Sequence, residues 1–213
     1  LKKVENPKNA YIMISNHVGF MDAFLIFGRP EHLCYIVKKS IMSLPFFGLL
    51  VKYKQCISID RFSSKNRKSV VETMKNYAES LSKDEKLPAM FLFPEGTVSN
   101  GKGIINFKMG AFILGLPVKP TALKFEGEFI PSLSMMGSLD CVLGTLMQPI
   151  NYITTYDLDC CVKPQTGVSD EEFANEVRNL MINEFGFQDL PNTFENFIEY
   201  NKNYGRFGNS EFK

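Results

Sequence analysis

The sequence predicts an α/β fold with a mostly parallel or mixed central sheet flanked by helices. Short apolar runs rich in β-branched and aromatic residues alternate with segments whose apolar residues recur at helical spacing. Two candidate motifs each follow directly on a predicted strand, which is where sites lie in open α/β sheets. The chain has 213 residues, 45% of them hydrophobic and 22% charged, so it can enclose a substantial core.

The apolar runs predict the strands of this sheet. They cover Tyr11–Ser15, Tyr35–Val37, Ile57–Ile59, Met90–Phe93, Val118–Leu123 and a segment around Asp159–Val162. Helical segments separate several of them. Such alternation favours parallel neighbours, because parallel strands need a crossover connection.

Three segments carry helix signals. A helix is predicted over Lys65–Ser82 from residues that recur at helical spacing. These residues are Val70, Met74, Tyr77 and Leu81. A capping box at Ser169–Glu172 starts a second helix, which Gly186 ends. A third is expected over Met21–Phe27, after the first motif.

Composition restricts the function classes. The net charge of +1 gives no case for nucleic acid as a partner. The five Cys are odd in number and form no C-x-x-C pair, so neither a disulfide framework nor a metal site is expected, and a reducing compartment fits better. No linker divides the chain. We expect one domain over residues 1–190 and a C-terminal extension over 191–213.

No segment reaches the roughly 20 apolar residues of a membrane-spanning helix. Two apolar segments come part of the way, Ile41–Val51 and Ile130–Ile150. Each is either buried core or an interfacial surface that dips into a bilayer beside the site. The chain begins with Leu1 rather than Met. We therefore expect a fragment that lacks its membrane anchor.

The first motif places a His and an Asp five positions apart. Asn16 and His17 follow the first predicted strand, and Asp22 comes next in the pattern. On a continuous helix this offset is a rotation of about 140°, so the two side chains meet only if the chain bends, and Gly19 permits a bend. We expect His17 on a loop and Asp22 in the first turn of the Met21–Phe27 helix. A carboxylate on Nδ1 would leave Nε2 free to act as a general base.

The second motif is Phe93–Thr97, with the sequence FPEGT, at the end of a predicted strand. Pro94 ends the strand and Gly96 allows a sharp turn, so that Glu95 and Thr97 project from a tight loop. No G-x-S-x-G element and no Cys in a nucleophile setting accompanies these motifs. This favours direct group transfer over a covalent enzyme intermediate.

Together these motifs resemble the PlsC-type glycerolipid acyltransferase family. Four blocks occur in the family's order: Asn16-His17 with Asp22, Ile57–Arg61, Phe93–Thr97 and Leu116–Pro120. The segments around Arg61–Ser82, Asn106–Phe112 and Phe194–Asn196 are similar to the eukaryotic lysophosphatidylcholine/lysophosphatidylethanolamine acyltransferase branch. Val98 stands where that branch tends to have Cys.

The resemblance implies roles for named residues. His17 would be the general base, Asp22 its orienting carboxylate, and Arg61 the ligand of the acceptor's phosphate. The residues implied at the acceptor's glycerol-phosphate are Glu95, Gly96 and Thr97. Those implied to shape the loop near the thioester are Pro117 and Pro120. Further candidates for phosphates of CoA or lipid are Lys38, Lys39 and Lys108, with a solvated surface Lys as the alternative for each.

The resemblance implies an enzyme that moves a fatty acyl group from acyl-CoA to the free hydroxyl of a lysophosphatidylcholine- or lysophosphatidylethanolamine-type acceptor. It implies no cofactor and no metal, a membrane surface as partner, and the endoplasmic reticulum or another endomembrane as location, with the catalytic domain facing the cytosol. One alternative is a lysophosphatidic acid or glycerol-3-phosphate acyltransferase. Another is a catalytically silent lipid-binding domain, and a Ser or Cys hydrolase is a third.

Overall fold

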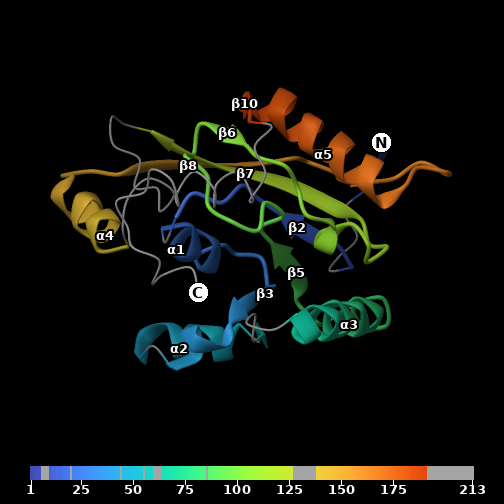
Figure 1. The fold of residues 1–213 in the computed structure, drawn as a ribbon, viewed down its shortest axis with the longest axis horizontal. Coiled ribbons are helices and arrows are strands. Elements are labelled where there is room, and N and C mark those ends of the chain that lie inside the picture. Colours follow the sequence, from blue (N-terminus) through green and yellow to red (C-terminus); the bar gives the residue numbers. More distant parts are fainter. Residues whose placement is uncertain are drawn as a thin grey trace.

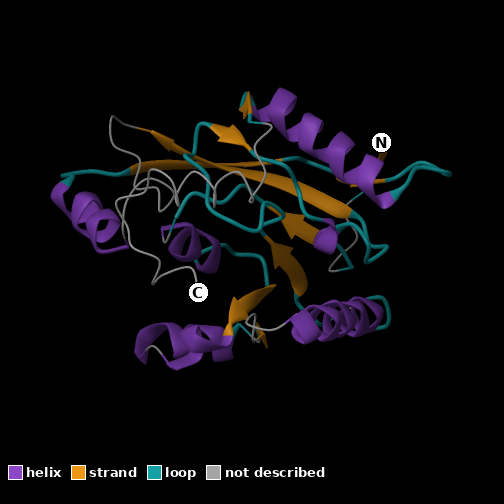
Figure 2. Cartoon of the chain, viewed as in Figure 1, coloured by secondary structure: helices purple, strands orange, loops and turns teal. Residues whose placement is uncertain are grey.

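The computed structural model describes residues 1–5, 10–19, 21–43, 45–54, 56–59, 64–84, 86–126 and 138–190. Its centre is a mixed sheet with helices around it (Figures 1 and 2), which confirms the predicted α/β class. Five neighbouring strands are parallel, in the order β7-β2-β5-β3-β4. Their bounds are Ile12–Ile14 for β2, Leu33–Lys38 for β3, Ile57–Ile59 for β4, Ala89–Leu92 for β5 and Val118–Glu126 for β7.

Antiparallel strands extend the sheet beyond β7. β9 (Cys161–Lys163) pairs with β7 and with β1 (Lys2–Val4), and β8 (Tyr152–Asp157) pairs with the length of β7 from Thr121 to Glu126. The strand predicted around Asp159–Val162 is therefore β9, shifted by a residue or two. β8 was not predicted, because most of its side chains are exposed and the apolar alternation is weak.

The predicted helices are present. α1 covers Met21–Phe27 and α3 covers Ser64–Leu81. α5 covers Asp170–Phe185, with the capping box at Ser169 and a left-handed Gly186 after its end. The sequence patterns did not reveal η1 (Lys39–Ser43), α2 (Pro45–Tyr53), η2 (Met109–Ala111) or α4 (Ser138–Met147). The short pair β6 (Gly103–Ile104) and β10 (Gln188–Asp189) was also missed.

Two apolar clusters cover the two faces of the sheet. On one face, Ile12 and Ile14 of β2 pack with residues of α3 and α5, including Met74 and Phe173. On the other face, Met13 packs with residues of α1, β3 and β5. Successive strand residues point to opposite faces, so β2 supplies both clusters and is buried throughout.

The described parts of the two apolar segments form helices that have both buried and exposed side chains. Within α2, Val51 is buried while Leu49 and Tyr53 are exposed. Of Ile130–Ile150, the structure describes the part from residue 138 onward, which forms α4 with Cys141 buried and Met147 83% exposed. No helix among the described residues is long and apolar enough to cross a bilayer. The predicted extension at 191–213 lies outside the described residues.

Candidate active site

The first motif forms the expected contact between its His and its Asp. β2 ends at Ile14, and His17 lies on the loop that leads to α1, whose second residue is Asp22. The chain bends at Gly19, whose carbonyl accepts a hydrogen bond from the Asp22 N–H at 3.3 Å. As a result, His17 Nδ1 lies 2.7 Å from Asp22 Oδ2.

Asp22 is held by a tight cluster of donors. Its Oδ2 accepts the backbone N–H groups of Val18 at 2.6 Å and Gly19 at 3.0 Å, besides facing His17 Nδ1. The side chain is fully buried, while the His17 side chain is 27% exposed. Nδ1 is therefore bound to Asp22, and Nε2 is the ring nitrogen that this carboxylate does not contact.

The loop that carries His17 is fastened to β7 by side chains. Asn16 forms a reciprocal pair with Leu123, donating to its carbonyl at 2.9 Å and accepting from its N–H at 2.8 Å. Two residues before Asn16, Ile14 is in register with Pro120 of β7. Pro120 has no N–H to donate, and the Thr121 Oγ1 atom donates to the Ile14 carbonyl at 3.0 Å. Asn16 is fully buried, so its motif position serves the backbone. The sequence pattern by itself indicates no role for Asn16.

The second motif lies against the first. It follows β5, which is paired in parallel with β2, and the Glu95 Oε1 atom accepts the His17 N–H at 3.1 Å. The Phe93 ring stacks on the imidazole with 4.0 Å between centroids and 14° between planes. Ser99 donates its N–H to the His17 carbonyl at 2.7 Å. The sequence pattern gives no role to Phe93, which opens the second motif, or to Ser99, since no local pattern reveals a contact across strands.

Glu95 is a buried acid, 1% exposed. Burial raises its pKa well above the ordinary value, and the neighbouring Asp22 charge raises it further. The backbone N–H groups of His17 and Ile105 and the charge of Arg178 act in the opposite direction. Burial is the largest of these effects, so the net shift of the Glu95 pKa is upward.

Gly96 makes room for a lysine. It has a φ of +68°, and a Cβ added there would lie 2.7 Å from Lys108 Cδ and 2.9 Å from Lys108 Nζ. The Lys108 backbone N–H also donates to the Pro94 carbonyl at 2.7 Å. The side chain of Lys108 therefore runs across the turn of the second motif. This brings one of the predicted phosphate candidates to the candidate site.

The remaining predicted residues have other positions. Arg61 lies outside the described residues, and nothing of the Lys38 side chain is described. Lys39 is exposed at the start of η1. Pro117 precedes β7, whereas Pro120 lies inside β7 rather than in a loop, which corrects that part of the prediction. Thr97 is half-buried on the loop after Gly96.

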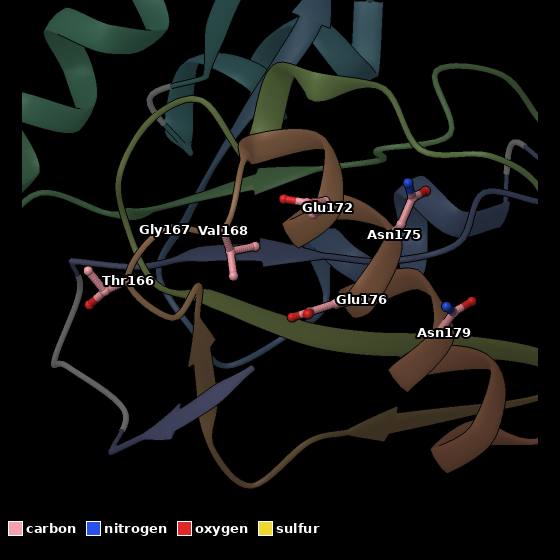
Figure 3. Close-up of a pocket in the computed structure, with 7 residues that line it drawn as sticks. All are labelled: Thr166, Gly167, Val168, Glu172, Asn175, Glu176 and Asn179. Atoms are coloured by element: carbon pink, nitrogen blue, oxygen red, sulfur yellow. The ribbon is translucent and has the colours of Figure 1, made fainter.

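A separate cavity of about 470 Å³ lies at the start of α5 (Figure 3). It is lined by Thr166, Gly167, Val168, Glu172, Asn175, Glu176 and Asn179. None of the described residues of the two motifs lines it. Its two carboxylates make it a poor match for a polyphosphate ligand.

Comparisons with known proteins identify the family. A family model described as "Acyltransferase" matches residues 2–124. Lysophospholipid acyltransferase LPEAT1 of Arabidopsis thaliana is 31% identical over 183 residues, which are 84% of this chain and 46% of that protein. Lysophosphatidylcholine acyltransferase 1 of Homo sapiens is 28% identical over 196 residues, 87% of this chain and 35% of that protein. The chain thus spans less than half the length of these relatives.

A solved structure has the same fold. It is the 1-acyl-sn-glycerophosphate (LPA) acyltransferase PlsC from Thermotoga maritima, with a TM-score of 0.55 and 20% identity, covering 86% of this chain and 69% of that chain. At this identity the likeness concerns the fold. The family model spans both motifs and more than half of the 213 residues, and from it we conclude that the chain belongs to the acyltransferase family.

Proposed function

We propose that the protein transfers a fatty acyl group from acyl-CoA to the free hydroxyl of a lysoglycerophospholipid of the lysophosphatidylcholine or lysophosphatidylethanolamine type. The observation that carries the proposal is the 2.7 Å contact between His17 Nδ1 and the fully buried Asp22. The names of the relatives point to lysophospholipid acceptors. No cofactor or metal takes part in the proposed reaction.

The proposed reaction is a direct transfer with His17 as general base. The Nε2 atom of His17 removes the proton of the acceptor hydroxyl while the hydroxyl oxygen attacks the carbonyl carbon of the thioester. The tetrahedral intermediate collapses, the carbon–sulfur bond breaks, and the imidazolium returns the proton to the thiolate of CoA. Asp22 stabilises the imidazolium between these steps, and the stacked Phe93 ring presents its negative face to the same cation.

Cations beside the site are proposed to hold the phosphates. The Lys108 side chain lies across Gly96, which directly follows Glu95, the residue that accepts the His17 N–H. Its ammonium suits a phosphate as a point charge, and the permanently charged Arg61 suits two parallel hydrogen bonds. The Gly96–Thr97 turn would face the glycerol-phosphate of the acceptor, and Pro117 the thioester. Lys39 is a weaker candidate, because it is exposed and an ordinary solvated role suits it equally well.

A membrane surface is the proposed partner, and an endomembrane such as the endoplasmic reticulum the proposed location. α4 ends just before Tyr152, which pairs with Glu126 at the carboxyl end of β7, so α4 lies at that end of the sheet (Figure 1). His17 follows the carboxyl end of the parallel strand β2. Leu146 is 75% and Met147 83% exposed on α4. Such exposed apolar side chains support insertion into a lipid interface near the site.

One other acceptor class is supported by a specific observation. The solved structure with the same fold is named as an acyltransferase of 1-acyl-sn-glycerophosphate. An acceptor of that type, or glycerol-3-phosphate, would use the same base and the same phosphate ligands. A panel of acceptors separates these possibilities.

The test is release of free thiol from oleoyl-CoA by the full-length protein in liposomes, with a panel of lysophospholipid acceptors. We expect release that requires one acceptor class and is lost in His17→Ala. The matched control is His32→Ala, because the His32 side chain is exposed and lies outside the motifs. Release without any acceptor would indicate a thioesterase. Equal release by wild type and His17→Ala would refute the general base, and no release with any acceptor would favour a silent lipid-binding domain.

A further inference from the structure

Glu95 is placed where it meets His17 rather than the acceptor. The family resemblance puts this residue at the glycerol-phosphate, yet its side chain is 1% exposed. Its Oε1 accepts the His17 N–H at 3.1 Å, and its Oε2 is buried with no hydrogen-bond partner among the residues that the structure describes. A direct bond from the acceptor to this carboxyl would require the turn to open and the contact with His17 to be replaced.

The surroundings of Glu95 favour a neutral side chain. Asp22 lies nearby and binds His17 Nδ1 and two backbone N–H groups, whereas Glu95 has only backbone N–H groups, those of His17 and Ile105, as donors among the described residues. The nearby cation, Arg178, donates to the carbonyls of Ile104 at 2.7 Å and Ile105 at 3.0 Å and pairs with Asp189. A second buried negative charge beside Asp22 would be costly, since two carboxylates in one buried region do not both ionise readily.

The contact made by Glu95 controls the position of the base. His17 is held at its ring by Asp22, at its ring face by Phe93, at its carbonyl by Ser99 and at its N–H by Glu95. Glu95 is thus one of the links between the turn of the second motif and the backbone of the base. A shift of about 1 Å in a catalytic group can lower a rate about 100-fold, so this link matters for catalysis.

We propose that Glu95 is a positioning residue that works as a neutral acid, holding His17 through its backbone N–H and making no contact with the acceptor. The proposal rests on the proposed function in that His17 is the general base. It assigns acceptor binding in the second motif to the turn around Gly96 and to Lys108. Glu95 and Asp22 then have opposite roles, one uncharged and structural, the other charged and coupled to the imidazole.

The test compares three substitutions at Glu95 in the full-length enzyme. Glu95→Gln keeps the carbonyl that accepts the His17 N–H and places an NH₂ group where the acid has its hydroxyl, so we expect kcat and the acceptor KM within about threefold of wild type. Glu95→Ala removes the link, and kcat should fall about 100-fold with the acceptor KM within about threefold. Glu95→Asp keeps the acid but shortens its reach, and should fall below Glu95→Gln in kcat. Glu79→Gln, exposed on α3, is the matched control.

The opposite ranking would overturn the proposal. If Glu95 binds the acceptor as a carboxylate, Glu95→Gln raises the acceptor KM at least about tenfold, the typical effect of losing a hydrogen bond to a charged group. A Glu95→Gln protein that fails to fold while Glu95→Asp folds would also refute it, because the fold would then require the ionised form.

A measurement on wild type alone is independent of the variants and of turnover. In protein labelled with ¹³C at the glutamate side-chain carboxyls, we expect one carboxyl signal at the chemical shift of a protonated acid at pH 7. A spectrum in which every glutamate is ionised at pH 7 would refute a neutral Glu95. Absence of acceptor-dependent thiol release in wild type would instead overturn the proposed function and leave this spectrum as the test of Glu95.

Discussion

Replacing Asp22 by Asn removes the charge that faces the imidazole while keeping the side chain's size. The Asn carbonyl can still accept from Val18 and Gly19, which donate to the same oxygen in wild type. What is lost is the attraction between carboxylate and imidazolium across the 2.7 Å contact of His17. This attraction acts once the proton has moved to the imidazole. The substitution should therefore lower kcat much more than it lowers stability.

The magnitude follows from the geometry. The charges are spread over the imidazole ring and the carboxylate, so their centres are roughly 4 Å apart, and at an effective dielectric constant of about 20 their attraction is about 4 kcal/mol. Each 1.36 kcal/mol is a factor of ten, so kcat should fall about a thousandfold. The burial of Asp22 supports this dielectric constant, because water does not reach its carboxylate.

The assay is the rate of thiol release from oleoyl-CoA at saturating acceptor, together with thermal unfolding of each protein. Asp84→Asn is the matched control, since Asp84 is exposed, lies outside both motifs and accepts the Lys86 N–H in a turn. A folded Asp22→Asn enzyme that keeps more than about a tenth of the wild-type kcat would refute the reasoning, because the loss would then be under about 1.4 kcal/mol.

Three further outcomes are expected. Gly96→Ala and Gly115→Ala should each lower the free energy of unfolding in urea by about 1 to 2 kcal/mol, because their backbones have φ values of +68° and +70°; the flexible end of Lys108 can move away from a Cβ at Gly96, so a much larger loss at Gly96 than at Gly115 would contradict this. Asn16→Ala should lower the free energy of unfolding by about 3 kcal/mol, because the buried N–H and carbonyl of Leu123 on β7 are left unpaired. A loss below about 1 kcal/mol would contradict this role of Asn16. Because the pKa of Glu95 is raised in the folded state, the folded protein binds the proton more tightly than the unfolded chain. Wild type should therefore lose stability relative to Glu95→Gln as pH rises above about 4.5, by up to about 1.4 kcal/mol per pH unit. Parallel curves of stability against pH for the two proteins would contradict the raised pKa.

The local parts of the site were predictable from neighbouring residues. His17 and Asp22 are five positions apart, and a strand end, a Gly and a helix start suffice to bring them together. The capping box of α5 and its Gly186 stop depend on residues within one turn, and both were predicted. α4 was missed because its apolar residues cover the exposed side, so its pattern lacks the polar face that marks an ordinary surface helix.

The sequence by itself determined the fold class, the family and the pair formed by His17 and Asp22, because these depend on local patterns. Tertiary structure alone decided that Glu95 lies against His17. Parallel pairing of β2 with β5 sets Ile14 opposite Leu92. His17 comes three positions after Ile14, and Glu95 comes three positions after Leu92. Strand register is a property of two segments 78 residues apart, and the buried face that selects it exists only once the sheet has formed.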